Sequence, residues 1–111
     1  MQHIHNISTT DRARTLLRRE LGASRPRQGD VTALVYISTF TNADGTTVQG
    51  FEPGYMVGPV SDGHFGEVWA LAHLSDRMTF LFMPKFTWRA EENYVVDLAS
   101  ETFALFSIGP A

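Results

Sequence analysis

Three side chains of the metal-binding and acid–base type lie within ten positions of one another: His64, Glu67 and His73. Histidine and glutamate bind zinc, and both transfer protons in catalysis. The zinc-protease motif places two histidines four residues apart on one helical face, and this segment lacks that spacing. On a strand, His64 and His73 face opposite sides of the sheet; on a helix, about 13 Å separates them along the axis. We therefore predict no metal ion and no cofactor, and keep these residues as candidates for the mouth of a pocket.

Serine-based catalysis has no recognisable motif in this chain. It contains no cysteine and no Gly-x-Ser-x-Gly elbow. Ser61, Asp62 and His64 bring nucleophile, acid and base types together, but the members of a catalytic triad usually come from separate parts of a fold. We interpret this segment as a turn.

The N-terminal quarter of the chain is strongly basic, whereas the rest is acidic. Up to position 27, six arginines stand against two carboxylates; the remainder carries three basic and ten acidic residues. Arginine pairs bidentately with carboxylates and phosphates, so these arginines face the acidic part of this chain, a second copy, nucleic acid or an anionic surface, or they form a solvated face without a partner. The pI of about 5.7 and the lack of interleaved aromatic residues disfavour nucleic acid. The predicted polar contact surface comprises Arg12, Arg14, Arg18, Arg19, Arg25 and Arg27.

Seven aromatic residues are concentrated between positions 80 and 106. One helix does not cover so many rings on one side of a small sheet. Two interpretations follow: the sheet buries this face against a second copy, or it closes around an apolar pocket. We favour the second copy. The residues on which both interpretations depend are Phe80, Phe82, Phe86 and Trp88.

The composition is that of one compact domain. A chain of 111 residues that is 43% hydrophobic can bury a core of its own, so we predict a single domain over residues 1–111. Without cysteine, no disulfide supports it. No apolar run has the length of a membrane span, and the first residues lack the pattern of a signal peptide. We therefore expect a soluble, cytoplasmic protein.

The first regular element is predicted to be an amphipathic helix over about residues 10–21. Thr10 can cap it, Asp11 places a negative charge in its first turn, and Gly22 can end it. At ~100° per residue, one face carries only apolar residues apart from Glu20. These apolar residues are Ala13, Leu16, Leu17 and Leu21. We expect residues 1–7 to be a flexible tail and residues 23–29 to be a linker to the sheet.

Beyond Asp30 the pattern changes to the alternation typical of strands. The turn at 42–45 predicts a hairpin, and Pro84 marks a bend or an edge. We interpret residues 52–59 as a loop. Residues 64–75 fit a second helix as well as a strand, and we favour the strand because it avoids a long structureless loop. The predicted strands are 31–40, 46–51, 78–88, 94–98 and 102–108.

These elements predict an α+β fold, in which the N-terminal helix packs on a twisted antiparallel sheet of five or six strands. The alternative is a mostly-β, barrel-like domain. For function, we predict a small non-catalytic binding or assembly domain that acts as a homo-oligomer. The alternative is a small enzyme or ligand-binding protein whose aromatic-lined apolar pocket carries His64, Glu67 or His73 at its mouth.

Overall fold

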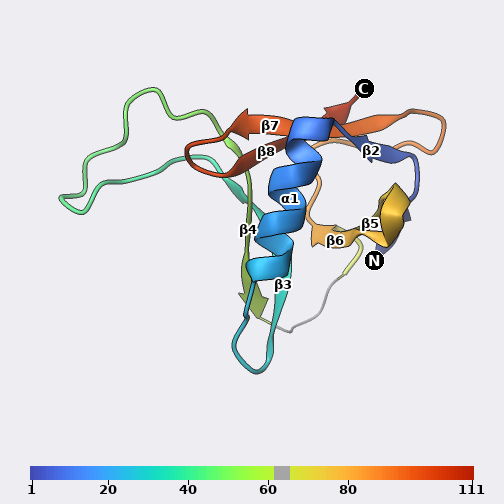
Figure 1. The fold of residues 1–111 in the computed structure, drawn as a ribbon, viewed down its shortest axis with the longest axis horizontal. Coiled ribbons are helices and arrows are strands. Elements are labelled where there is room, and N and C mark those ends of the chain that lie inside the picture. The colour runs from blue at the N-terminus through green and yellow to red at the C-terminus, as the bar shows by residue number, and fades with distance from the viewer. Residues whose placement is uncertain (62–65) are drawn as a thin grey trace.

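The computed structural model describes residues 1–61 and 66–111. In chain order, the elements are β1 (Gln2–Ile4), β2 (Ile7–Thr9), α1 (Asp11–Ala23), β3 (Asp30–Ile37), β4 (Gly54–Ser61), β5 (Ala70–His73), the short 3₁₀ helix η1 (Ser75–Arg77), β6 (Thr79–Phe82), β7 (Tyr94–Ser100) and β8 (Leu105–Pro110). Within the described residues, α1 packs on an eight-stranded mixed sheet of order β1-β5-β6-β3-β4-β8-β7-β2 (Figure 1). The α+β class is confirmed, although the sheet has more strands than predicted and is not purely antiparallel.

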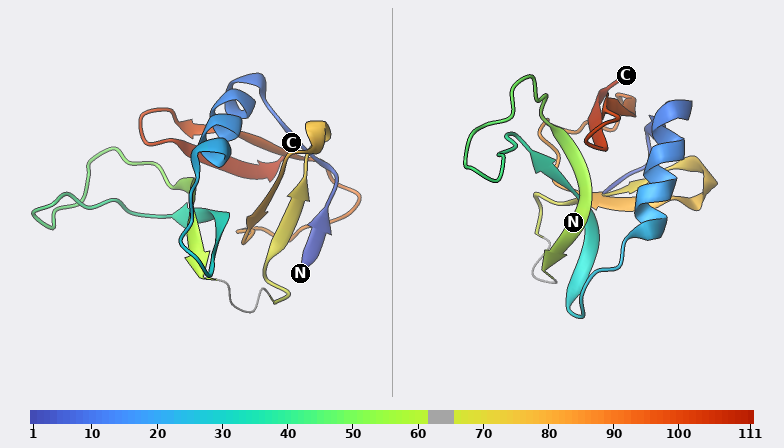
Figure 2. Two further views of the ribbon diagram at one scale, coloured as in Figure 1. Left: turned by 60° about the horizontal axis from the view of Figure 1, so that its bottom comes forward. Right: turned by 60° about the vertical axis from the view of Figure 1, so that its left-hand side comes forward.

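The sheet curls because one short segment binds both of its ends. β1 pairs in parallel with β5, and β2 pairs in parallel with β7. Only His5 and Asn6 separate β1 from β2 in the chain, yet these strands stand at opposite ends of the strand order. The N-terminal segment therefore draws the two edges of the sheet together, which gives the sheet a barrel-like curvature (Figure 2).

The flexible tail predicted for residues 1–7 is wrong. Ile4 is fully buried and Ile7 is 6% exposed, and both belong to the main hydrophobic core. Strands of three residues are too short to show an alternating pattern, so the sequence gives little sign of them. Burial of the two isoleucines, together with pairing to β5 and β7, holds this segment on the sheet.

Helix α1 follows the prediction closely. The Thr10 hydroxyl accepts a hydrogen bond from the Ala13 amide, which makes Thr10 the N-cap. Ala13, Leu16 and Leu17 are buried where the helix packs against β7 and β4. Gly22 does not end the helix, which continues to Ala23; the predicted linker thus starts one residue later. No helix in the described part of the chain is long and apolar enough to cross a membrane.

The hairpin predicted after β3 is wrong. The partner of β3 is β4, in an antiparallel register that runs from Asp30 opposite Ser61 to Ile37 opposite Gly54. The predicted strand 46–51 is instead part of a long connection, and the predicted loop 52–59 forms most of β4. Proline is tolerated there because Pro59 lies where β4 pairs with β3 alone. We call residues 38–53 the arm. It projects from the side of the domain opposite β1 and β5 (Figure 1).

The remaining strand predictions are partly confirmed. The predicted strand 78–88 is shorter, since β6 ends at Phe82, before Pro84, and residues 83–93 form a loop. The closing hairpin is confirmed as β7 and β8, with a bulge between Leu98 and Ser100. In the ambiguous segment 64–75, residues 70–73 form β5, so a helix is excluded for them.

Candidate functional site

The aromatic residues of β6 lie inside the domain. Phe80 is 3% exposed and Phe82 is fully buried. The Phe82 ring lies 5.4 Å from that of Phe80 and 5.8 Å from that of Tyr55, measured between centroids. The curled sheet therefore covers these rings with its own strands. The prediction that Phe80 and Phe82 belong to an exposed face or pocket is wrong, because it counted the helix as their only cover.

Phe86 and Trp88 lie at the surface in a groove of about 380 Å³, which we call the Trp88 groove. The Trp88 indole N–H donates to Asn6 Oδ1 at 3.1 Å, and the Asn6 amide donates to the carbonyl oxygens of Arg89 and Glu92. These bonds tie the loop after β6 to the N-terminal segment. The lining residues are Gln2, Glu67, Val68, Pro84, Phe86, Thr87 and Trp88.

Of the predicted pocket residues, the structure thus brings together Glu67, Phe86 and Trp88. His73 lies elsewhere, at the end of β5, and His64 lies outside the described residues. In the described ranges, no group of three or more histidine and carboxylate side chains is arranged to hold a metal ion.

A second groove, which we call the aromatic groove, lies at the base of the arm. It has a volume of about 280 Å³. The Lys85 amide donates to the Tyr55 hydroxyl at 3.0 Å, and the Lys85 ammonium lies 5.1 Å from the centre of the Tyr36 ring, in a cation–π contact. Burial raises the pKa of the Tyr55 hydroxyl above its ordinary value of 10.0. The lining includes Tyr36, Pro53, Tyr55, Lys85, Phe86 and Phe106.

The arm carries aromatic residues at its root and polar residues toward its tip. Phe40 and Phe51 pack on each other and on Phe103 of the β7–β8 turn, with ring centroids 5.4–5.7 Å apart. Phe40 and Tyr36, the latter near the end of β3, are each 37% exposed. Because Tyr36 and Pro53 also line the aromatic groove, the arm and the groove form one continuous surface. We call it the docking surface.

The tip of the arm keeps a negative charge. Asp44 accepts hydrogen bonds from both the hydroxyl (2.6 Å) and the amide (3.0 Å) of Thr46, which lower the pKa of its carboxyl group. The Asn42–Gly45 turn was therefore recognised correctly, and it closes a single bridge between Thr41 and Thr47. The sequence indicated the turn but not the arm that carries it.

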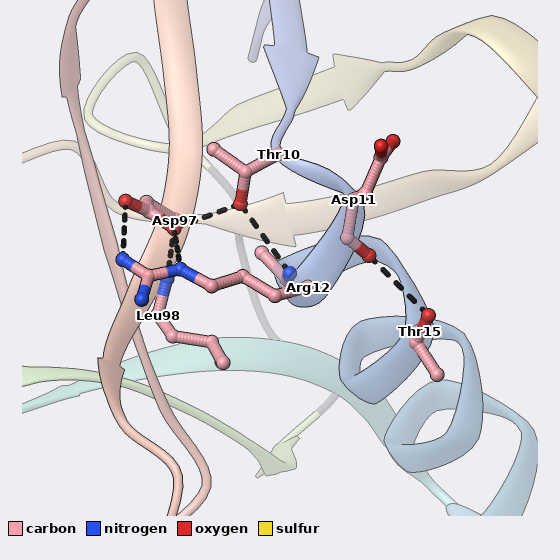
Figure 3. A network of polar contacts seen from close by, with 7 residues as sticks. Thr10, Asp11, Arg12, Thr15, Asp97 and Leu98 are labelled. Carbon is pink, nitrogen blue, oxygen red and sulfur yellow. Dashed lines mark hydrogen bonds and ion pairs between the residues drawn. The ribbon is translucent and has the colours of Figure 1, made fainter.

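Arg12 is bound to its own chain. Its Nε and Nη2 atoms each donate to the Asp97 carboxylate at 2.9 Å, a bidentate pair between α1 and β7 (Figure 3). Asp97 also accepts from the Thr10 hydroxyl at 2.7 Å and from the Leu98 amide at 2.8 Å. These bonds hold the pKa of the Asp97 carboxyl well below its ordinary value of 3.8, the Arg12 bonds having the largest effect, and they raise the pKa of Arg12. The pairing fixes the start of α1 on the sheet.

Other members of the predicted arginine surface also contact their own chain. Arg14 donates to the Thr9 hydroxyl. Arg19 pairs with Glu20 at 3.2 Å, so the carboxylate that the sequence placed on the apolar side of the helix has an ion-pair partner. Arg25 donates to the carbonyl oxygens of Gly22 and Ser24, so it caps the end of the helix. Arg18 and Arg27 are exposed. Contacts within the chain therefore account for much of the polar surface that the sequence predicted.

Comparison of the chain with protein family models, with curated proteins and with solved structures finds no match.

The Asp97 network predicts a specific acid response. Because the folded state lowers the pKa of Asp97, its contribution to stability is complete above the ordinary value of 3.8 and is lost as the pH falls below it. We expect the urea midpoint of the wild type to fall between about pH 6 and about pH 3, and to fall less in Asp97→Asn. Glu101→Gln, at an exposed carboxylate of the neighbouring turn, is the control and should keep the wild-type profile. Equal acid responses in all three proteins would refute the role of this network.

Proposed function

We propose that this protein is a small non-catalytic binding domain that acts as a homo-oligomer through the docking surface. The observation that carries the proposal is the arm. Connections longer than about 12–15 residues without regular structure are uncommon in compact domains, where they are usually either functional segments or linkers. Here the connection carries the exposed ring of Phe40, and the exposed ring of Tyr36, near the end of β3, lies in the aromatic groove at its base.

The charges of the docking surface support a second copy as the partner. Lys85, the only lysine in the sequence, has no ion-pair partner among the described residues, although its ammonium lies over Tyr36. The arm carries the acidic Asp44 and Glu52. In a two-fold dimer the same surface is used by both copies, so the arm of one copy can place its carboxylates near Lys85 of the other.

The cysteine-free sequence supports a reducing compartment, such as the cytoplasm, as the place of action. Burial of the exposed rings supplies the apolar part of the association, and the ion pairs supply its orientation.

The test is sedimentation velocity at concentrations from about 1 μM to about 200 μM. We expect the wild type to move from the 12.4 kDa monomer to a dimer over this range. The double variant Tyr36→Ser/Phe40→Ser removes the exposed rings and should weaken association at least about tenfold, which corresponds to about 1.4 kcal/mol. Lys85→Glu should weaken it as well, because the arm is acidic.

Val68→Ser is the matched control, since Val68 is 63% exposed and lies in the Trp88 groove instead. Circular dichroism at low concentration establishes that each variant is folded. A wild type that stays at 12.4 kDa throughout would overturn the proposal, and so would a control that weakens association as much as the double variant.

A further inference from the structure

Three histidines meet at the edge of the sheet formed by β1 and β5. His3 lies on β1, His5 directly follows it, and His73 ends β5. His3 Nδ1 and His73 Nε2 are 2.9 Å apart, a hydrogen-bond distance. The His5 ring lies nearly parallel to the His73 ring, with an angle of 10° and 4.3 Å between centroids. The parallel register of β1 and β5, in which His3 stands opposite Leu71, brings these residues together.

The contacts depend on protonation. An N–H···N bond between two imidazoles needs one nitrogen that carries a lone pair, and a protonated histidine donates from both nitrogens. When His3 and His73 are both protonated, two N–H groups face each other across 2.9 Å and the bond is lost. Protonation of His5 adds a further positive charge next to the His73 ring.

The surroundings of His73 favour its neutral form. Burial, and then the neighbouring His5 and His3, lower the pKa of His73. Within the described part of the chain, these two histidines are the ionisable groups that act on it. On β6, the strand on the other side of β5, the residue paired with His73 is the uncharged Thr79. No described carboxylate therefore offsets the positive charge that forms when the cluster is protonated.

We propose that His3, His5 and His73 form a proton-sensitive latch, which holds β1 on β5 at neutral pH and releases it at mildly acidic pH. The direction follows from linkage: the latched state favours the neutral form of His73, so release takes up a proton. The contribution of the latch is complete above the ordinary histidine value of 6.5 and is lost as the pH falls below it. This inference does not rest on the proposed function, because the arm projects from the side of the domain opposite β1 and β5 (Figure 1).

Release of β1 would change the surface of the domain. β1 has three residues and forms an edge of the sheet, and Ile4 is its buried anchor. When it leaves, the β5 edge presents unpaired N–H and C=O groups, which are a template for pairing with a strand of another chain. Acid would thereby expose a strand-binding edge that neutral pH keeps covered.

Hydrogen exchange measured by NMR at about pH 7.5 and about pH 5.5, corrected for the intrinsic exchange rate, tests the latch. We expect the protection of the β1 amides to drop at least about tenfold at the lower pH relative to the β7–β8 hairpin, which serves as the internal reference. The His73 ring signals should titrate below 6.5.

Two variants separate the latch from general acid sensitivity. In His73→Gln, and independently in His3→Gln/His5→Gln, the relative protection of β1 should respond less to pH than in the wild type. The second variant keeps the test valid if the first one is poorly folded. Wild-type β1 protection that does not change with pH would overturn the proposal, and so would a pH response in both variants that is as large as that of the wild type.

Discussion

Replacement of Phe82 by alanine is expected to lower the free energy of unfolding by about 3–5 kcal/mol, enough to leave much of this small domain unfolded. Phe82 is fully buried, and its ring packs on those of Phe80, Tyr55 and Phe86. Truncation leaves a cavity that the two paired neighbours of β6, namely β3 and β5, cannot fill without losing their register. Urea denaturation followed by circular dichroism measures the change.

Phe82→Leu is the matched control for this prediction. Leucine keeps much of the apolar volume, so we expect a cost below that of alanine, about 1.5 kcal/mol. Phe82→Ala also tests whether the Phe82 ring belongs to the core of the domain or to an interface between copies. If Phe82 lay at an interface between copies, as the sequence suggested, Phe82→Ala would give a folded monomer of unchanged stability, and the described core would be incorrect.

Gly54→Ala is expected to destabilise the domain by about 1–3 kcal/mol through overpacking. Gly54 begins β4 at the root of the arm. A Cβ atom there would lie 2.9 Å from the carbonyl oxygen of Phe106, 3.1 Å from Leu105 Cβ and 3.3 Å from Ala99 Cβ. The closest of these atoms belongs to the backbone of β8, so relief requires one strand to shift away from the other.

Gly58→Ala on the same strand is the control, because its new Cβ would meet only Val35 Cγ2, at 4.0 Å. We expect its free energy of unfolding, measured by urea denaturation, to change by no more than about 0.5 kcal/mol. Since Gly54 joins the arm to the sheet, Gly54→Ala should also weaken self-association, while Gly58→Ala should not. Equal effects of the two substitutions on stability would contradict the close approach of β4 to β8.

Local signals in the sequence were sufficient for the helix and for the last hairpin. Thr10 is a capping residue, and the spacing of Ala13, Leu16 and Leu17 marks one face, so propensity and burial agree over α1. In β7 and β8, two alternating runs follow each other with a short turn between them. The signals for both elements come from residues close in the sequence, although α1 also packs on the distant strands β7 and β4.

The arm was not predictable, because the partner of β3 is selected by tertiary packing. The turn at 42–45 resembles that of a hairpin, yet it closes only one bridge. The two glycines and the single proline of β4 resemble those of a loop. Gly54 is required by the close approach of Phe106, and Pro59 is tolerated where β4 has one partner. Neither reason can be seen from neighbouring residues alone.

The contacts of the candidate site residues also depend on tertiary packing that the sequence does not show. Glu67, Phe86 and Trp88, which lie within 22 positions of one another, line one groove together with the distant Gln2. His73 instead contacts His3, 70 positions away in the chain. That contact depends on the parallel pairing of two short strands, for which no local pattern exists. The sequence indicated that an arginine of the helix could pair with a carboxylate of the acidic sheet. It did not indicate that the two residues would be Arg12 and Asp97.

The most direct test of the proposed function is hydrogen exchange, measured by mass spectrometry on dilute and on concentrated wild-type protein at neutral pH. Association through the docking surface predicts that peptides from the arm, residues 38–53, and from the segment around Lys85 become protected as concentration rises. Peptides from α1 and from β1 should not change. Protection that rises with concentration only in α1 would contradict association through the docking surface. So would a protein that dimerises while no peptide becomes more protected.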